Sequence, residues 1–314
     1  MRLVIQVPCH DEAGTLAEVL AELPRTVPGV DDVKVLVIDD GSTDGSAALA
    51  ERCGADRVVR LARRQGLAAA FLVGVETALA MGADLIVNTD GDHQYPGACV
   101  PELVAPLLRG EADLVVGDRR PHQEPRNALS KRLIHRLGNA LVRRATGLEV
   151  HDASSGFRAM SRALALRLHV LSRFSYTLEM LVWAGEDGAR YREIPIRTRP
   201  PRRSSRLFRS VPEYVFRSAL LLARAYVLRA PLRAFGALAV PCLLLGGGLF
   251  AWGLSRGGAA PLVGAGVSTA VGAQLLLLGV WGEVQRPSRR LQRELLARVR
   301  ALESKGRGPG DSAP

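Results

Sequence analysis

The stretch VKVLVIDDGSTDGS, residues 33–46, places an apolar run directly before a turn made of Asp, Gly, Ser and Thr. A short apolar run bounded by such turn residues is typical of a strand buried in a sheet. Four similar runs occur at 3–8, 56–61, 84–90 and 113–119, and helical patterns such as 15–23 and 67–81 lie between them. This alternation predicts an α/β fold with a doubly wound, mainly parallel sheet.

Polar turns follow four of these runs. They are PCHDEAG (8–14), DDGSTDGS (39–46), DGDHQYP (90–96) and GDRR (117–120). In an open parallel sheet, ligands bind beyond the carboxyl ends of the strands. Any one turn could also serve only as a loop or helix cap, since Ser42, Thr43 and Asp44 are good N-cap residues. Because four turns meet at one edge, we favour a ligand site there.

The residues in these turns favour a divalent cation. The chain has no GxGxxG after its first strand and no GxxxxGK[ST] loop, which removes the main support for a dinucleotide or P-loop site. Clustered carboxylates at a strand end suit a hard cation that is shared with phosphates. We expect Asp90 and Asp92 to bind Mg²⁺ or Mn²⁺, with the amide oxygen of Gln94 as a third ligand. His93 is the weaker candidate, because alternation along an extended turn points it away.

The charge is distributed unevenly along the chain. Residues 1–196 carry 23 Lys and Arg against 26 Asp and Glu, whereas residues 197–233 carry ten Arg against Glu213 alone. A nucleic-acid-binding protein carries its basic footprint on the folded domain. Here the basic segment adjoins an apolar one, so we expect a membrane surface and no nucleic acid as partner.

Two apolar segments, residues 234–254 and 259–281, contain no charged residue. Each is long enough to cross a bilayer as a helix, and the four-residue link SRGG between them requires an antiparallel hairpin. Arginines flank the open end, which places both termini and the catalytic domain on the cytoplasmic side of the inner membrane, in a multi-pass arrangement. Two buried core helices are the alternative. Small residues such as Gly246–Gly248 also allow close packing, so a homo-oligomer through the hairpin is one expectation.

The segment before the hairpin has an amphipathic pattern. In residues 212–229, Glu213, Arg217 and Arg224 share one side of a helix. Such a helix can lie in the headgroup plane, or it can be an ordinary surface helix. The expected domains are therefore a catalytic domain (1–205), an amphipathic juxtamembrane region (206–231), two transmembrane helices (232–283), and a charged helix with a disordered tail (284–314).

Several motifs together resemble one family. VPCHDEAGTL (7–16), VIDDGSTDGS (37–46) and TDGDHQYP (89–96) resemble the signature of family-2 glycosyltransferases with the GT-A fold. Four downstream segments resemble the dolichyl- or polyprenyl-phosphate mannosyltransferase branch: DLVVGDR (113–119), HDASSGFRAMSR (151–162), SYTLEMLVWAG (175–185) and EIPIRTRPPRRSSRLFRS (193–210). The likeness covers roughly residues 3–210.

The resemblance implies a nucleotide-sugar pocket built from the first, second and fourth turns. Its members are Pro8, His10, Glu12, Asp39, Asp40, Asp90 and Gly91. The resemblance further implies that the diphosphate of the donor would lie on a divalent metal held by Asp90, Asp92 and Gln94. Residues 10–12 are His-Asp-Glu where the family usually has Tyr-Asn-Glu, which is a departure at the base and ribose contacts.

The resemblance also implies residues for catalysis and for the acceptor. The catalytic candidates are Asp92, Asp152 and Arg119, and the acceptor or phosphate candidates are Arg132, Arg158, Glu179, Arg203 and Arg206. Structural alternatives stay open: Asp152 can cap a turn, Glu179 can pair with an Arg, and Arg132 and Arg158 can be structural. The basic loop 197–209 can serve only to attract anionic lipid.

The chemistry of sugar transfer agrees with these residues. Negative charge develops on the leaving diphosphate, which a Lewis-acid metal and Arg donors stabilise. A polyprenyl phosphate is already anionic near neutral pH and needs no general base, so Asp152 or Glu179 would orient it. Direct displacement would invert the anomeric centre. We therefore expect a membrane-anchored inverting glycosyltransferase that acts on a nucleotide sugar and a polyprenyl phosphate. The alternatives are a different glycolipid or polysaccharide acceptor, and a non-catalytic membrane scaffold.

Overall fold

A computed structural model describes residues 1–120, 129–168, 176–200 and 211–306. The chain forms two compact units, Met1–Ala219 with Leu296–Pro314, and Leu220–Leu295. The expected boundary at residues 205 and 206 lies outside the described residues, and the boundary between the two units falls inside a helix.

The first unit is built on a sheet that has seven strands among the described residues. They are β1 (Arg2–Cys9), β2 (Asp32–Asp39), β3 (Arg57–Arg60), β4 (Leu85–Asn88), β5 (Leu114–Asp118), β6 (Arg158–Ser161) and β7 (Tyr191–Pro195). Their spatial order is β3-β2-β1-β4-β6-β5-β7. β6 pairs antiparallel with β4 and β5, and the other pairs are parallel. The predicted mainly parallel α/β sheet is confirmed.

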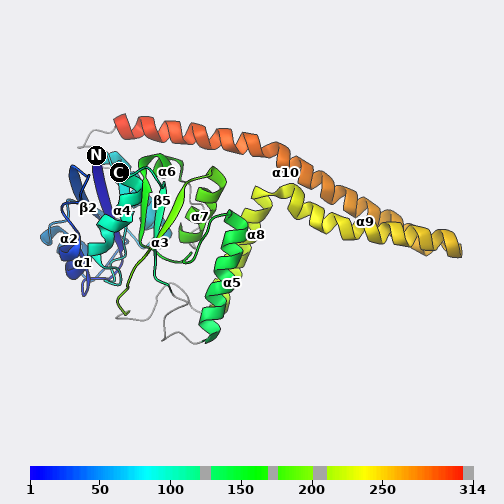
Figure 1. The fold of residues 1–314 in the computed structure, drawn as a ribbon, viewed down its shortest axis with the longest axis horizontal. Coiled ribbons are helices and arrows are strands. Elements are labelled where there is room, and N and C mark those ends of the chain that lie inside the picture. The colour runs from blue at the N-terminus through cyan, green and yellow to red at the C-terminus, as the bar shows by residue number, and fades with distance from the viewer. Residues whose placement is uncertain (121–128, 169–175, 201–210, 307–314) are drawn as a thin grey trace. The chain divides into compact units, whose positions relative to one another are not determined.

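Helices cover both faces of this sheet (Figure 1). They are α1 (Leu16–Glu22), α2 (Ser46–Arg52), α3 (Leu67–Ala80), η1 (Gly97–Cys99), α4 (Val100–Leu108), α6 (Arg162–Arg167) and α7 (Tyr176–Asp187), and α5 (Leu129–Thr146) packs against α7. On one face, Leu3, Ile5 and Val7 of β1 pack with α1 and α4 in a buried core. On the other face, Gln6 Nε2 donates to Phe71 O of α3 at 3.4 Å. Successive side chains of β1 thus point to opposite faces of the sheet and contact different layers of helices.

The strand directions gather the polar turns at one edge. β1, β2, β4 and β5 run the same way, so the residues that follow Cys9, Asp39, Asn88 and Asp118 emerge together. β6 runs in the opposite direction, and therefore the segment that precedes Arg158 reaches the same edge. This edge is where the sequence places its candidate ligand site.

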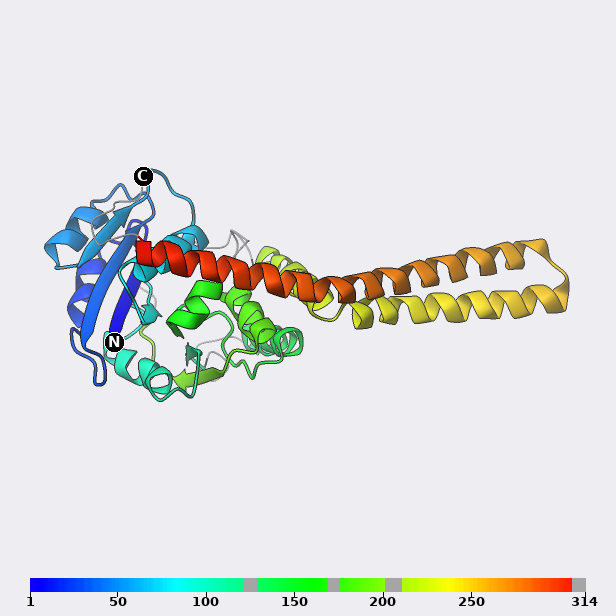
Figure 2. The ribbon, with the colours of Figure 1, turned by 90° about the horizontal axis from the view of Figure 1, so that it is seen from above.

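The second unit is a helical hairpin. Two helices follow α8 (Val211–Arg229): α9 (Pro231–Arg256) and α10 (Ala259–Gly306). Figure 2 shows α9 and the first part of α10 side by side and antiparallel. Ser268 Oγ donates to Cys242 O at 2.7 Å, and a Cβ at Gly272 would lie 2.7 Å from Leu243 Cγ. Small residues thus let the two helices pack closely, as predicted.

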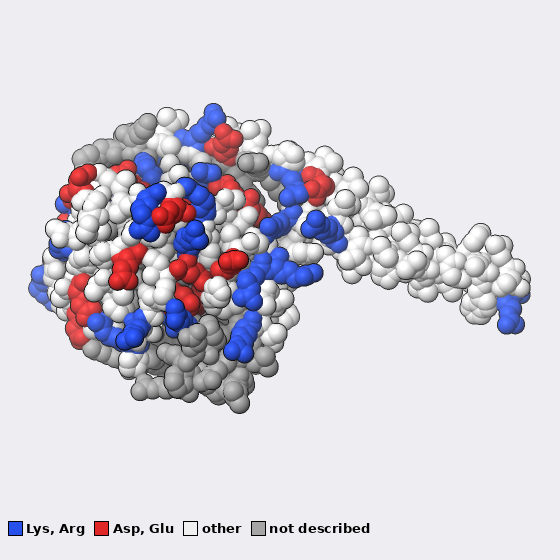
Figure 3. Space-filling view, viewed as in Figure 1, with Lys and Arg blue, Asp and Glu red and all other residues white. Residues whose placement is uncertain are grey.

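The hairpin is almost free of charge (Figure 3), with Arg256 at its turn. Pro231–Arg256 and Ala259–Ser288 are each long and apolar enough to cross a membrane. The charged helix predicted within residues 284–314 is not a separate element, because α10 continues without interruption from residue 259 to residue 306.

Two helical glycines give a matched test of the packing in the first unit. A Cβ at Gly185 in α7 would collide with the backbone carbonyl of Thr146, whereas nothing lies within 4 Å of the same position at Gly138 in α5. We expect Gly185→Ala to destabilise the protein by about 1–3 kcal/mol through overpacking. Gly138→Ala is expected to leave stability unchanged or to raise it by up to about 1 kcal/mol, because Ala favours the helix. Denaturant unfolding of both variants checks this, and equal effects would contradict the close contact.

Candidate active site

The first two polar turns are bonded to each other. Asp11, with φ +52°, donates from its backbone N to Ser42 Oγ at 2.9 Å, and its Oδ1 accepts from Thr43 N at 2.9 Å. Ala13 N donates to Asp44 Oδ2 at 2.9 Å. The turns after β1 and β2 therefore form one fixed rim.

The acidic pair at the end of β2, Asp39 and Asp40, is buried and hydrogen-bonded. Asp40 accepts from Gln65 N at 2.7 Å and from Gly66 N at 2.8 Å, one bond to each carboxylate oxygen. Asp39 accepts from Ser42 N at 3.0 Å. A Cβ at Gly41 would lie 2.7 Å from Arg64 N, so only glycine allows this approach. Both predicted nucleotide residues thus shape the loop beside the rim.

The turn after β1 contributes the other expected nucleotide residues. Pro8 lies buried in β1, and Glu12 is also buried, with its backbone N donating to Ser46 Oγ at 3.0 Å. His10 Nδ1 is buried and has no hydrogen-bond partner among the described residues. Burial of a polar atom without a hydrogen bond costs free energy, so a ligand that bonds to this ring nitrogen would recover that cost.

The turn after β4 presents a carboxylate that lacks a partner. Asp90 Oδ1 is buried without a hydrogen bond within the described part of the chain. A Cβ at Gly156 would lie 2.8 Å from Asp90 Oδ2, so glycine is needed opposite the carboxylate. Gly91 packs similarly closely on Cys9, and its carbonyl accepts from Thr15 Oγ1 at 2.8 Å. The backbone holds the Asp90 carboxylate in place, whereas no described residue donates a hydrogen bond to its Oδ1.

Burial raises the pKa of the Asp90 carboxyl to about 7. The nearby Asp92 carboxylate adds to this rise, while Arg119 and Arg158 oppose it. A carboxylate in these surroundings is more stable with a cation beside it than alone.

Asp92 and Gln94 lie together in the same turn. Gln94 N donates to Asp92 Oδ1 at 3.1 Å, and the Gln94 amide nitrogen donates to Asp92 Oδ2. His93, with φ +61°, turns its ring to Glu22 and Glu18 instead. The expected orientation of His93 away from the paired carboxylates agrees with this geometry.

Arg119 and Asp152 form a buried ion pair. Arg119 Nε lies 2.7 Å from Asp152 Oδ2, and Nη2 lies 2.9 Å from Oδ1. Burial by itself raises the pKa of Asp152, yet the Arg119 guanidinium and its hydrogen bonds outweigh that effect and lower it overall. Asp152 also accepts from Ser154 N at 3.3 Å, so it caps the turn as well. An ionised, bidentate Asp152 holds Arg119 in one orientation.

A buried network that the sequence reasoning missed connects β4 to the segment before β6. Asn88 accepts from Gln6 Nε2 at 2.9 Å and donates to Gly156 O at 2.8 Å and to Tyr176 Oη at 3.1 Å. Tyr95 Oη accepts from Gly156 N at 3.0 Å. These bonds place Gly156 against Asp90. The polar residue Gln6 inside an apolar run was the signal that could have revealed the network.

Arg158 lies in the interior. Its guanidinium donates to the carbonyls of Ser155 (2.8 Å), Thr177 (2.7 Å) and Ala153 (2.9 Å), and its side chain has no exposed surface. Burial lowers its pKa. This placement favours the structural alternative for Arg158, in which the residue joins the segment before β6 to α7.

The remaining acceptor candidates belong to different parts of the chain. Glu179 lies in the first turn of α7, and Arg132 lies in α5, where the structure describes only the backbone. Arg203 and Arg206 lie outside the described residues.

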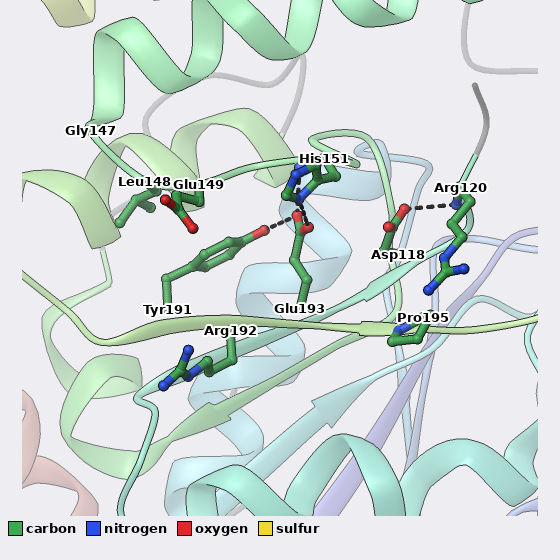
Figure 4. A pocket seen from close by; sticks show the side chains of 10 residues that line it. All are labelled: Asp118, Arg120, Gly147, Leu148, Glu149, His151, Tyr191, Arg192, Glu193 and Pro195. Atoms are coloured by element: carbon green, nitrogen blue, oxygen red, sulfur yellow. Dashed lines mark hydrogen bonds and ion pairs between the residues drawn. The ribbon is translucent and has the colours of Figure 1, made fainter. Parts of the chain in front are cut away.

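A pocket of about 720 Å³ opens beside β5 and β7 (Figure 4). Its lining comprises Asp118, Arg120, Gly147, Leu148, Glu149, His151, Tyr191, Arg192, Glu193 and Pro195. Glu193 accepts from His151 N at 2.8 Å and from the Tyr191 hydroxyl. These bonds support the backbone that leads into Asp152. Because acidic and basic groups line the pocket together, it favours no class of charged ligand.

Comparison with known proteins assigns the family. The model of Glycosyl transferase family 2 matches residues 4–168, which include all four polar turns. The chain belongs to this family.

Two characterised relatives of this family 2 glycosyltransferase act on lipid phosphates by name. Undecaprenyl-phosphate mannosyltransferase of Micrococcus luteus is 30% identical over 62% of this chain and 83% of its own. Polyprenol monophosphomannose synthase of Mycolicibacterium smegmatis is 31% identical over 62% of this chain and 76% of its own.

A solved structure shares the fold. Glucosyl-3-phosphoglycerate synthase from Mycobacterium tuberculosis, in complex with Mn²⁺, UDP-glucose and phosphoglyceric acid, has a TM-score of 0.55 and 26% identity. The match covers 73% of this chain and 79% of that one. The family 2 chain is thus similar to an enzyme that binds a divalent metal together with a nucleotide sugar.

The residues of this glycosyltransferase fit such a metal. Asp90 has an oxygen without a partner, and the side chains of Asp92 and Gln94 carry further oxygens in the same turn. The described residues contain no group of three His, Cys, Asp or Glu side chains that could hold a metal without help. Mg²⁺ is often held by one or two carboxylates plus substrate phosphates, so this donor set suits a metal that arrives with a diphosphate.

The raised pKa of Asp90 predicts how the metal-free protein responds to pH. In the unfolded chain this carboxyl loses its proton near pH 4, whereas in the folded chain it keeps it up to about pH 7. The folded state binds the extra proton in this window, so Asp90 makes the free energy of unfolding fall as pH rises from about 4 to 7. Asp90→Asn removes this effect. We expect the variant in EDTA to have a Tm several degrees above wild type at pH 8, with a smaller difference at pH 4.5.

Thermal unfolding of the intact, detergent-solubilised proteins measures this difference. A Tm for Asp90→Asn at or below that of wild type at pH 8 would contradict the assigned burial of the charge.

Proposed function

We propose that this family 2 glycosyltransferase transfers a sugar from a nucleotide-diphosphate sugar to a polyprenyl phosphate at the cytoplasmic face of a membrane. The observation that carries the proposal is the Asp90–Gln94 turn, which presents a carboxylate with one buried, unpartnered oxygen at the ligand edge of the sheet. The names of the two lipid-phosphate relatives support this acceptor, and so does the apolar hairpin.

The donor would bind across the first, second and fourth turns. Asp90, Asp92 and Gln94 are proposed to hold a divalent metal, which supplies a Lewis acid for the charge that develops on the leaving diphosphate. The base and ribose would lie in the rim of the first two turns. Its proposed members are Pro8, His10, Glu12, Asp39, Asp40 and Gly91. The unpartnered His10 Nδ1 is a donor or acceptor suited to that contact.

Arg119 is proposed to bind an anionic oxygen of the donor or the acceptor. Its Nε donates to Asp152, and its Nη2 donates to Asp152 and Ser154. Its Nη1 makes no hydrogen bond to any described residue. Asp90 and Arg119 interact electrostatically, so both groups act on one region of the edge. An Arg fixed by Asp152 needs no reorientation when charge develops.

Asp152 is proposed to position Arg119 and not to remove a proton. Its lowered pKa makes it a weak base, and a phosphate acceptor is already anionic at neutral pH. Direct attack of the acceptor phosphate oxygen on the anomeric carbon would invert that centre. Glu179, Arg132, Arg203 and Arg206 are proposed to contact the acceptor. Arg158 would support the site from the interior.

The hairpin is proposed to anchor the chain in the inner membrane with both termini in the cytoplasm. Arg256 stands alone at the turn, whereas many arginines flank the open end. This asymmetry follows the positive-inside rule. A phosphate headgroup would then be delivered to the active-site unit from the membrane surface, where basic residues attract it. Packing of two hairpins into a homo-oligomer is compatible with this arrangement.

The metal assignment predicts the behaviour of Asp92→Asn. We expect this variant to lose roughly 100-fold or more in kcat/KM for sugar transfer, because the neutral amide weakens binding of the cation. Asp31→Asn, which changes an exposed carboxylate that pairs with the N-terminus, is the matched control and should keep its activity. The assay combines purified protein, Mg²⁺ or Mn²⁺, and a panel of nucleotide sugars with undecaprenyl or dolichyl phosphate.

Both Asp variants should remain in the membrane fraction. Wild-type activity of Asp92→Asn would contradict the metal site. A product formed only with phosphoglyceric acid or another soluble acceptor would contradict the proposed lipid-phosphate acceptor. The proposed sugar transfer itself would still hold.

The proposed topology predicts a labelling pattern in intact cells. A cysteine at Ser255, beside the hairpin turn, should react with a membrane-impermeant maleimide from outside. A cysteine at the exposed Arg52 of α2 should react only after permeabilisation. The wild-type chain, which has four cysteines of its own, gives the background. Labelling of Arg52→Cys in intact cells, with Ser255→Cys protected, would show the opposite orientation.

A further inference from the structure

His93 occupies an unusual place in the metal-binding turn. It is buried, and its φ of +61° lies in the left-handed region, which few non-glycine residues adopt, although histidine does so more often than most, as do Asn and Asp. This conformation turns the ring away from Asp92. His93 Nε2 lies 2.9 Å from Oε1 of Glu22, the last residue of α1, and Nδ1 lies 3.3 Å from Oε2 of Glu18, in the first turn of that helix. The turn is thereby attached to a helix outside the metal site.

Arg199 bonds to the same place from the segment after β7. Its Nη1 lies 2.9 Å from Glu22 Oε2, and its Nη2 lies 2.9 Å from Glu22 Oε1. Nη1 also lies 3.0 Å from His93 Nε2. Its backbone N donates to Gln94 O at 3.0 Å. A forked Arg–carboxylate pair has little freedom to rotate, so Arg199 holds Glu22, His93 and the Gln94 carbonyl in one geometry.

The backbone next to this cluster is packed without space. A Cβ at Gly97 would collide with the carbonyl of Glu22 and lie 3.1 Å from Leu23 N. At the other end of the turn, Thr15 Oγ1 donates to Gly91 O at 2.8 Å. The segment from Gly91 to Gly97 therefore meets α1 at both ends. Both contacts restrain the ends of the segment that carries Asp92.

We propose that Arg199 and Glu22, acting through His93, are positioning residues for the metal ligands Asp92 and Gln94. This assignment rests on the proposed function. Neither residue touches the metal or the substrate in this account. The cluster instead reduces the number of conformations of the turn, so that two carboxylates with mutual repulsion are already placed when the cation and the diphosphate arrive.

The chain contains a matched control. Arg190 forms the same kind of forked pair with Asp113, with Nε 3.0 Å from Oδ2 and Nη2 2.9 Å from Oδ1. It directly precedes β7, and so lies at the amino end of the parallel strands, away from the metal turn. Arg190→Gln removes an equivalent ion pair without touching the turn.

The test measures Mn²⁺ binding by the intact protein, by electron paramagnetic resonance, with saturating UDP or GDP. We expect Arg199→Gln and Glu22→Gln each to weaken the Mn²⁺ Kd roughly tenfold. The double variant should lose little more than either single one, because both remove the same pair. Arg199→Lys, which keeps the charge and loses the fork, should recover part of the affinity. Arg190→Gln should bind Mn²⁺ as wild type does.

Kinetics and stability add a second readout. Arg199→Gln should raise the metal concentration that gives half-maximal activity, while kcat at saturating metal and the Tm stay close to wild type. Wild-type Mn²⁺ affinity in both single variants would overturn the positioning role, and so would equal weakening in Arg190→Gln. Absence of Mn²⁺ binding by the wild-type protein would instead overturn the metal site of the proposed function, and this assignment with it.

Discussion

Two carboxylates, Asp90 and Asp92, stand one residue apart at the carboxyl edge of the sheet, and the buried oxygen of Asp90 has no partner among the described residues. Burial of an unpaired charge is expensive, and the pKa of Asp90 rises to about 7 as a result. Such a pair does not stabilise the hydrophobic core of a folded domain. In a site that receives a divalent cation with a diphosphate, the two carboxylates favour binding. The bound cation removes their mutual repulsion and offsets the cost of burying the Asp90 charge.

The rest of the first unit keeps that pair in place. Asn88 and Tyr95 fix Gly156 against Asp90, and Arg158 ties the neighbouring carbonyls together from inside. Asp152 holds Arg119 near the same carboxylate. The stability of a fold with several buried polar groups depends on each group having a partner. Among the described residues, several buried polar atoms lack a partner, and Asp90 Oδ1 is the one that belongs to a carboxylate, which makes it informative about function.

The sheet and its ligand edge were predictable because they depend on local patterns. Apolar runs such as residues 33–38, each followed by a polar turn, indicate parallel strands whose ends meet. β6 and β7 lacked that signal, since RAMS and YREIP are short and mix polar with apolar residues. The long apolar segments likewise predicted α9 and the first part of α10. The end of α10 was predicted as a separate helix, because a change from apolar to charged composition resembles a boundary although the backbone continues.

The environment of individual side chains was less predictable, because it depends on distant parts of the chain. His93 meets Glu22 across 71 residues and Arg199 across 106, and no spacing in the sequence indicates either contact. Arg158 looked the same as any other arginine near the acceptor motifs, and only the antiparallel strand β6 places it in the interior. Motifs therefore identify the turn that carries the chemistry, while the packing around it decides which neighbours act on the ligand and which hold the turn.

The most direct test is a structure of the protein with Mn²⁺ and a nucleoside diphosphate, recorded at a wavelength where manganese scatters anomalously. The account predicts one anomalous peak at the edge of the sheet, coordinated by Asp92 or Asp90 and by diphosphate oxygens, with Arg119 facing the same group. A diphosphate bound without manganese at this turn, or a manganese ion bound elsewhere in the unit, would contradict it.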